Sequence, residues 1–153
     1  MTMKISVRKM LPEDVNGVYE TEKSCFGAEA WSINDFKEIA ADESGIFAAL
    51  CAVSEGGIIG YICGNCVMGE LEIGSVAVKK EFRRLGAAKA LISALEEMFS
   101  PEKAFLEVRE SNIAAQRLYE SLGFYKVYVR KDYYSSPVED AIIMKKVYGS
   151  APF

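Results

Sequence analysis

The sequence predicts an α/β (α+β) fold in which about four helices flank one mixed central β-sheet. The first observation is the order of the local patterns, which runs β-α-α-β-β-β-α-β-α-β-β along the chain. The second is an amphipathic helix between two apolar strands, a connection that implies a right-handed crossover between parallel strands. The third is size, because 153 residues, half of them hydrophobic, suit one compact domain.

The first elements are a strand and two helices. Residues 4–9 alternate between apolar and polar side chains, which is a strand pattern. Pro12 opens a helix, because its fixed φ suits a first turn. Helical spacing then joins Val15, Val18, Tyr19, Glu22 and Phe26. A loop over residues 27–31 leads to Ser32, which is expected to cap a second helix over residues 33–41.

Three strands in a row are expected in the middle of the chain, over residues 45–53, 58–67 and 70–78. The sequence Glu55-Gly56-Gly57 predicts a tight turn between the first two. Met68-Gly69 predicts a second turn.

The second half holds the clearest helix, over residues 84–99, with Pro101 just beyond its end. Its apolar stripe consists of Ala88, Leu91, Ile92, Leu95, Met98 and Phe99. Another amphipathic helix is expected over residues 112–122, with Gly123 as a left-handed C-cap. The remaining strands are expected over residues 104–109, 124–131 and 141–147, the last two joined by a polar loop. The domain should therefore span residues 1–148, with a flexible tail over 149–153.

Composition excludes several functions. The chain has no histidine, which rules out serine-histidine triads and histidine metal sites, and no metal is expected. The net charge of −4 argues against direct nucleic-acid binding. No apolar run is long enough to span a bilayer, and the first residues lack an apolar signal core. We therefore expect a cytoplasmic protein with no membrane association, as a monomer or weak dimer.

Four cysteines are present, at positions 25, 51, 63 and 66. Cys63 and Cys66 have the C-x-x-C spacing that redox and zinc sites use. They fall in a predicted strand, however, where residues three apart face opposite sides. Buried reduced thiols are therefore the favoured interpretation over a redox or metal site.

A basic turn precedes the 84–99 helix. Lys79, Lys80, Arg83, Arg84 and Lys89 gather there against Glu81 alone. Cations at the positive end of a helix are locally unfavourable unless an anion binds there. Backbone N–H groups at such an end form a phosphate cradle, and Gly86 allows close approach. On the charge pattern alone, a solvated basic turn remains an equal alternative.

This turn resembles the GNAT superfamily of N-acetyltransferases. Arg83-x-x-Gly86-x-Ala88 is similar to the Q/R-x-x-G-x-G/A loop whose amides hold the diphosphate of acetyl-coenzyme A. The resemblance assigns that role to Arg84, Leu85, Gly86, Ala87, Ala88 and Lys89. It also implies that the backbone of Val76, Ala77 and Val78 pairs with the pantetheine arm and supplies an N–H donor to the reacting oxygen.

A second block resembles the same superfamily more specifically. Asn112, Ala115, Leu118-Tyr119 and Gly123-Phe124 match its N-x-x-A-x-x-L-Y-x-x-x-G-F pattern. The sequence Leu-Glu-Val-Arg at 106–109 and Ala30-Trp31-Ser32 resemble the RimI-type branch, apart from Ala30 where a proline is usual. That branch acetylates the N-terminal amine of a protein, in bacteria a ribosomal-protein alanine. The resemblance covers nearly the whole chain.

The resemblance also assigns the acid–base roles. Glu107 is the expected general base that deprotonates the amine, directly or through water, and Tyr119 the general acid that protonates the leaving thiolate. Asn112 would orient the pantetheine or Tyr119. Glu72 on the neighbouring strand is an alternative base. On strand and helix periodicity alone, Glu107 is an exposed strand residue and Tyr119 a core residue that shares a groove with Asn112.

The acceptor end of the groove is expected between two loops, over residues 27–32 and 131–138. By resemblance, Trp31, Tyr133 and Tyr134 line the site for a peptide N-terminus, although Trp31 could equally anchor the start of its helix in the core. Two alternatives stay open: a small-molecule amine acetyltransferase on the same fold, and a non-catalytic acyl-coenzyme A sensor. The sequence identifies no particular acceptor.

Overall fold

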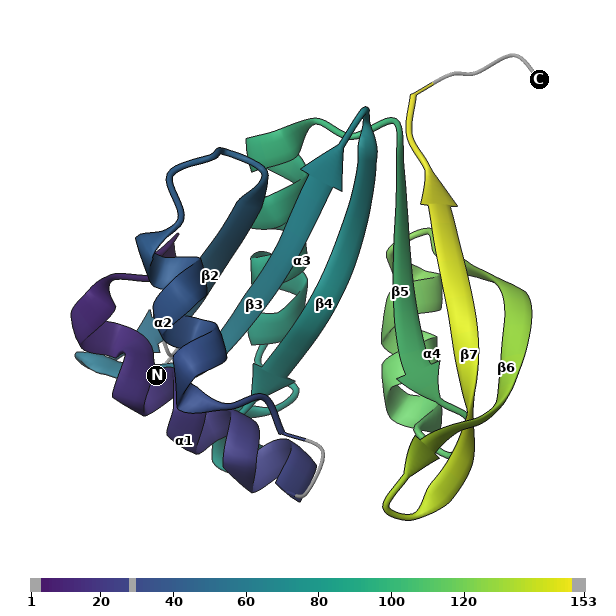
Figure 1. Ribbon diagram of the computed structural model, residues 1–153, viewed down its shortest axis with the longest axis horizontal. Helices are drawn as coiled ribbons and strands as arrows, with labels where there is room; N and C mark the ends of the chain where they lie inside the picture. Colours follow the sequence, from purple (N-terminus) through teal and green to yellow (C-terminus); the bar gives the residue numbers. More distant parts are fainter. Residues whose placement is uncertain (1–3, 28–29, 150–153) are drawn as a thin grey trace.

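A seven-stranded mixed sheet forms the centre of the molecule (Figure 1). The computed structural model describes residues 4–27 and 30–149. The strand order is β1-β2-β3-β4-β5-β7-β6, and neighbours are antiparallel except for the parallel pair β4 and β5. The strands are β1 (Ser6–Lys9), β2 (Phe47–Ser54), β3 (Gly57–Val67), β4 (Glu70–Val78), β5 (Lys103–Arg109), β6 (Tyr125–Ser135) and β7 (Val138–Val147). The predicted mixed sheet with one parallel crossover is confirmed.

Four α-helices cover the two faces of this sheet. They are α1 (Val15–Phe26), α2 (Ile33–Ala41), α3 (Ala87–Phe99) and α4 (Ile113–Ser121), with short 3₁₀ turns at Pro12–Asp14 and Lys80–Phe82. Helices α1 and α2 lie on one face, and α3 and α4 lie on the other (Figure 1). Ser32 caps α2 as predicted, because its hydroxyl accepts a hydrogen bond from the Asp35 amide at 3.2 Å.

Each face has its own hydrophobic core. Leu91, Ile92 and Leu95 of α3 are fully buried against the larger core. Val18 and Phe36 fill the smaller core beneath α1 and α2. Cys63 belongs to the smaller core and Cys66 packs against the larger, so the two thiols face opposite sides of β3, as predicted. All four cysteines are free.

Two predicted boundaries were wrong. Helix α3 begins at Ala87 rather than at residue 84, because Arg84 and Gly86 adopt left-handed φ values of 65° and 88°. The predicted loop over 131–138 is mostly strand, since β6 continues to Ser135 and β7 begins at Val138. The exposed edge strand β6 lacks the apolar alternation that marks a strand half-buried in a sheet. Of the predicted tail, residues 150–153 lie outside the described residues.

Strands β4 and β5 separate along their length (Figure 1). They pair only at Glu70–Lys103, Leu71–Ala104 and Glu72–Phe105. A β-bulge accompanies this separation: Cys63 pairs with Ser75 and Gly64 with Ile73, which leaves Gly74 as an extra residue on β4. Residues 73–78 of β4 therefore present one edge that no neighbouring strand of the described sheet covers.

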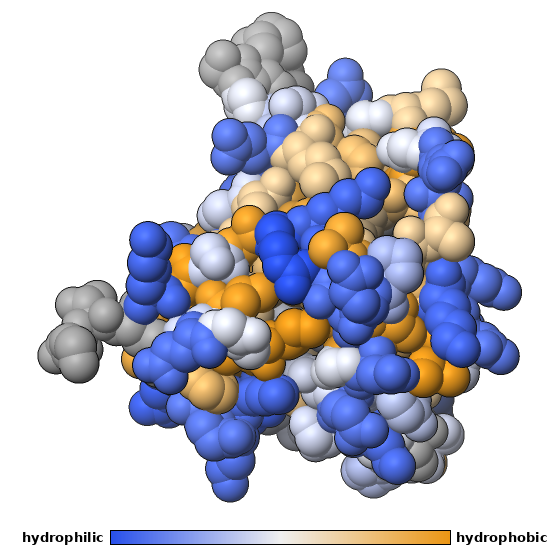
Figure 2. Space-filling model, turned by 90° about the vertical axis from the view of Figure 1, so that its left-hand side faces the viewer, coloured by the Kyte–Doolittle hydropathy of each residue, from blue (hydrophilic) through white to orange (hydrophobic). Residues whose placement is uncertain are grey.

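The surface is mixed in character. On the side of the molecule that lies at the left in Figure 1, hydrophilic side chains project between patches of hydrophobic surface (Figure 2). Within residues 4–27 and 30–149, no helix is both long and apolar enough to cross a membrane.

Candidate active site

A cleft of about 840 Å³ opens where β4 and β5 separate. The two strands contribute its walls. The hairpin of β6 and β7 and the start of α4 close one side, and α1 with Trp31 closes the other. Predicted site residues that line it are Trp31, Val76, Glu107, Asn112, Tyr119, Tyr133 and Tyr134. Residues far apart in the sequence therefore meet in one cleft.

Glu107 projects from β5 into this cleft. Its neighbours Leu106 and Val108 point into the larger core, which leaves the Glu107 side chain 34% exposed on the opposite face. Arg130 reaches it from β6, with Nη1 3.5 Å from Oε1. The carboxylate is thus both accessible to a ligand in the cleft and held by a cation.

Tyr119 and Asn112 reach the same cleft from α4, as their spacing predicts. Tyr119 is 7% exposed and its ring meets Phe124 edge-on, with centroids 6.1 Å apart. Burial raises the pKa of Tyr119 to about 12, so the hydroxyl carries its proton at neutral pH. Asn112 caps α4, because its Oδ1 accepts a hydrogen bond from the Ala115 amide at 3.1 Å. Its side-chain NH₂ group is the part that could contact a ligand.

The sequence predicts an anion cradle at the amino end of α3. The first amide to donate within this helix is that of Ala90, which bonds to Gly86 O at 2.9 Å, so the preceding amides have no intrahelical acceptor. Arg84, Leu85, Gly86 and Lys89 are exposed, whereas Ala87 is buried. The cradle lies just past the end of β4, outside the residues that line the cleft. Such free amides and nearby cations suit a diphosphate.

The open edge of β4 connects this cradle to the cleft. Val76 lines the cleft, whereas the side chains of Ala77 and Val78 are buried in the two cores. Only the backbone of those two residues could therefore meet a ligand. The Val78 carbonyl is already engaged, since it accepts a hydrogen bond from Arg83 Nε at 3.0 Å.

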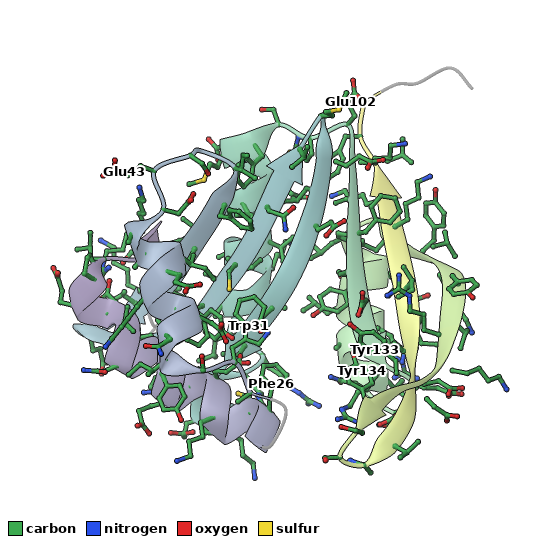
Figure 3. The ribbon with its side chains drawn as sticks, viewed as in Figure 1. Phe26, Trp31, Glu43, Glu102, Tyr133 and Tyr134 are labelled. Atoms are coloured by element: carbon green, nitrogen blue, oxygen red, sulfur yellow. The ribbon has the colours of Figure 1, made fainter. Side chains whose placement is uncertain are left out.

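Aromatic side chains face one another across the open end of the cleft (Figure 3). Trp31 and Phe26 stand on one side, and Tyr133 and Tyr134 on the other. Trp31 also packs on Phe36 of the smaller core, at 5.7 Å between ring centroids, so it serves as both core anchor and cleft wall. The bulged Gly74 makes room for it, because a Cβ there would lie 3.1 Å from the indole.

Arg109 stabilises the opposite wall. Its guanidinium donates to the carbonyls of Ser136 and Pro137 at 3.3 and 3.1 Å. It also bonds to Glu139 at 3.1 Å, and its central carbon lies 4.2 Å from the Tyr134 ring centroid. A guanidinium can stack and donate in its own plane at the same time. The hairpin that carries Tyr134 is therefore fixed to β5.

Two observations depart from the sequence-based assignment. Glu72 does not line the cleft; it lies at the paired end of β4, in register with Phe105. Glu22, which was assigned only to a helical stripe, is 1% exposed and lines the cleft. The sequence did carry a signal for this: Glu22 stands at an apolar-stripe position of the first helix, and a glutamate there is seldom buried unless other groups pair with it. Those partners come from other strands, so the sequence did not reveal them.

The described residues contain no grouping of three or more Cys, Asp or Glu side chains that could hold a metal ion. Within the cleft, the carboxylate of Glu107 could accept a proton and the hydroxyl of Tyr119 could give one.

Comparison with known proteins places these features in context. The family model described as Acetyltransferase (GNAT) family matches residues 15–124. A ribosomal protein bS18-alanine N-acetyltransferase of Escherichia coli K12 is 31% identical over 136 residues, covering 86% of this chain and 89% of the relative.

Solved structures share this fold. The crystal structure of the ribosomal-protein-S18-alanine N-acetyltransferase from Escherichia coli superposes with a TM-score of 0.82 at 27% identity, covering 98% of this chain and 99% of the other. Ard1 from Thermoplasma volcanium gives a TM-score of 0.83 at 25% identity, covering 95% and 99%.

Proposed function

This chain belongs to the acetyltransferase (GNAT) family, and from that membership we propose that it transfers the acetyl group of acetyl-coenzyme A to the α-amine at the N-terminus of a protein. A ribosomal protein with N-terminal alanine is the first acceptor to consider, because a relative that matches most of the chain is named for that activity.

The cleft between β4 and β5 is the observation that carries the proposal. Glu107, Tyr119 and Asn112 all line this cleft, and aromatic side chains stand at its open end. Aromatic faces and carboxylates together attract a cationic amine. The two aromatic walls leave the open end of the cleft between them, where an extended peptide end could enter.

Acetyl-coenzyme A fits the residues beside this cleft. The amides of residues 84–89 and the cations of Arg84 and Lys89 would hold its diphosphate. The uncovered edge of β4 would pair with its pantetheine arm, as a strand edge pairs with any extended amide chain. When bound, it supplies the activated acetyl thioester.

Glu107 removes a proton from the acceptor. An α-amine has a pKa of about 7.7–8.0, so most of it is protonated at neutral pH and cannot attack a carbonyl carbon. Glu107 accepts that proton directly or through one water molecule. Its contact with Arg130, with Nη1 3.5 Å from Oε1, helps to orient the carboxylate in the cleft.

Tyr119 supplies a proton to the sulfur. As the nitrogen–carbon bond forms, the carbon–sulfur bond breaks and leaves a thiolate. The Tyr119 hydroxyl carries its proton at neutral pH, and burial raises its pKa further, to about 12; it donates that proton to the thiolate. The ammonium must lose two protons to become an amide: Glu107 takes the first and passes it to solvent. The second leaves the nitrogen as the carbon–sulfur bond breaks and replaces, through water, the proton that Tyr119 gives to the sulfur, so no covalent enzyme intermediate is needed.

Labelled acetyl-coenzyme A and a peptide panel test this proposal. Short peptides with free N-terminal Ala, Ser or Met are compared with the same peptides blocked at the N-terminus and containing lysine. We expect label only on peptides with a free α-amine.

Label on the blocked peptides would instead indicate a lysine acetyltransferase. Label on polyamines or aminoglycosides but on no peptide would indicate a small-molecule acetyltransferase. Binding of acetyl-coenzyme A with no transfer to any of these amines would indicate an acyl-coenzyme A sensor.

A further inference from the structure

Glu22 is a buried carboxylate that the proposed mechanism does not use. It lies on α1, is 1% exposed, and takes part in no ion pair within the described part of the chain. A buried charge without a cation is costly unless several donors stabilise it. The hydrogen-bond partners of Glu22 therefore indicate what this buried side chain does in the fold.

The donors to Glu22 come from three other parts of the fold. The Tyr61 hydroxyl of β3 and the Ser75 hydroxyl of β4 both bond to Oε1, the second at 3.1 Å. The Trp31 amide donates to Oε2 at 2.8 Å. Tyr61 and Ser75 also contact each other at 2.8 Å. One carboxylate thus joins two central strands to the residue that forms one wall of the acceptor end.

Trp31 needs such an attachment. It precedes α2, whose own capping bonds begin only at Ser32, so they leave the Trp31 amide unsatisfied. The indole rests against Gly74 at the bulge of β4. A peptide that binds between Trp31 and the two tyrosines meets a wall whose position depends on the bond from the Trp31 amide to Glu22.

We infer that Glu22 is a positioning residue for acceptor binding: it accepts the Trp31 amide, holds the indole on Gly74, and so sets the width of the acceptor end of the cleft. This inference rests on the proposed function, since it concerns the same acceptor. It does not concern the acetyl-coenzyme A cradle, whose residues 84–89 lie beyond the end of β4, at the start of α3.

Two substitutions separate this role from general stability. In Glu22→Met the side chain keeps its approximate length and fills the core, while Tyr61 and Ser75 can still bond to each other. The Trp31 amide then has no acceptor. In Glu22→Gln the amide oxygen can still accept from Trp31, and the amide NH₂ can donate to the two hydroxyls. Glu20→Met, at an exposed position of the same helix, is the matched control.

Fluorescence gives the first readout, because Trp31 is the only tryptophan in the chain. We expect Glu22→Met to shift its emission to longer wavelength and to increase its quenching by acrylamide. Glu22→Gln and Glu20→Met should stay close to wild type. Unchanged emission and quenching in a folded Glu22→Met protein would overturn the inference.

Steady-state kinetics gives the second readout. We expect Glu22→Met to raise the KM for the peptide acceptor about tenfold, equivalent to about 1.4 kcal/mol, and to leave the KM for acetyl-coenzyme A within about twofold. Glu22→Gln should restore the peptide KM. An equal rise in both KM values would mean that Glu22 acts on the whole fold.

The third test uses the wild-type protein, so its result does not depend on whether a variant folds. Hydrogen exchange at the Trp31 amide should be slow relative to unbonded loop amides, and rapid exchange there would overturn the inference. Fluorescence and exchange need no acceptor, so they remain decisive even if no peptide is acetylated. A failure of the proposed function and a failure of this inference are therefore distinguishable.

Discussion

The guanidinium of Arg109 lies over the ring of Tyr134, with 4.2 Å between its central carbon and the ring centroid. The same group bonds to the carbonyls of Ser136 and Pro137 at the tip of the hairpin. Strand β5, which carries Glu107, therefore also fixes one wall of the acceptor end. The proposed base and the residue that fixes the wall are separated by a single residue in the sequence.

Replacing Arg109 with lysine should weaken acceptor binding. An ammonium cannot stack on Tyr134 and donate to several carbonyls at once, so the hairpin loses its fixed position. We expect the KM for the peptide to rise about 5- to 10-fold, with the KM for acetyl-coenzyme A unchanged, in steady-state kinetics. The exposed Arg117→Lys on α4 is the matched control. A normal peptide KM for Arg109→Lys would show that the hairpin needs only a positive charge.

Replacing Glu107 with glutamine should reduce kcat by about 10²- to 10⁴-fold, the range that general base catalysis contributes. Binding of acetyl-coenzyme A, measured by calorimetry, should not change, because Glu107 lies away from the cradle. Glu72→Gln makes the same chemical change one strand away, at a position outside the cleft lining, and should keep kcat within about twofold. A large loss in Glu72→Gln with normal kcat in Glu107→Gln would reverse the assignment of the base.

The strands and helices were largely predictable, because local periodicity and turn residues determine them. Ser32 and Gly123 marked helix ends correctly, whereas the predicted start of α3 at residue 84 was wrong. Both strands of the β6–β7 hairpin were predicted, but their extension toward the tip was missed, because the residues near the tip are polar and mostly exposed and no burial pattern distinguished them from a loop.

The cleft could not be predicted from residue patterns alone. It depends on where β4 and β5 stop pairing and on the bulge at Gly74, and both follow from long-range packing rather than from any local sequence. Glu22 illustrates the same limit: its partners Tyr61 and Ser75 lie 39 and 53 residues away. Resemblance to a family supplied Glu107, Tyr119 and the cradle, but no motif included Glu22.

Tyr119 makes stability sensitive to alkaline pH. Burial raises its pKa in the folded protein to about 12 from the ordinary value of 10.0. Between these values the unfolded chain loses the proton and the folded chain keeps it, so the stabilisation is fully present below about pH 10 and is lost as pH rises through about 12. Urea unfolding at increasing pH should show the free energy of unfolding falling over this range.

Tyr119→Phe removes the ionisable group and tests that assignment. The decline in unfolding free energy above about pH 10 should become shallower than in the wild type, although Tyr61 and Tyr148, whose pKa values burial also raises, still contribute. At neutral pH the variant should lose activity by about 10²-fold or more, because it cannot protonate the thiolate. Full activity in Tyr119→Phe would leave water or another group as the acid.

Gly86→Ala should separate the cradle from the rest of the fold. Gly86 has a φ of 88°, which an L-residue adopts only with strain, so the substitution should cost about 1–2 kcal/mol of stability. Gly56, in the turn between β2 and β3, has a φ of 80°, and at both glycines an added Cβ would meet no atom within 4 Å. Gly56→Ala therefore imposes the same strain far from the cradle. Both variants should lose similar stability in thermal unfolding.

Only Gly86→Ala should raise the KM for acetyl-coenzyme A, because the strained turn displaces amides that would bind the diphosphate. We expect the KM for acetyl-coenzyme A to rise about tenfold and the KM for the peptide to stay unchanged. In both variants, acetyl-coenzyme A should bind more weakly at higher salt, since Arg84 and Lys89 act through exposed charges. If Gly56→Ala raised the acetyl-coenzyme A KM equally, the effect would come from lost stability, and the phosphate cradle would have to be sought elsewhere.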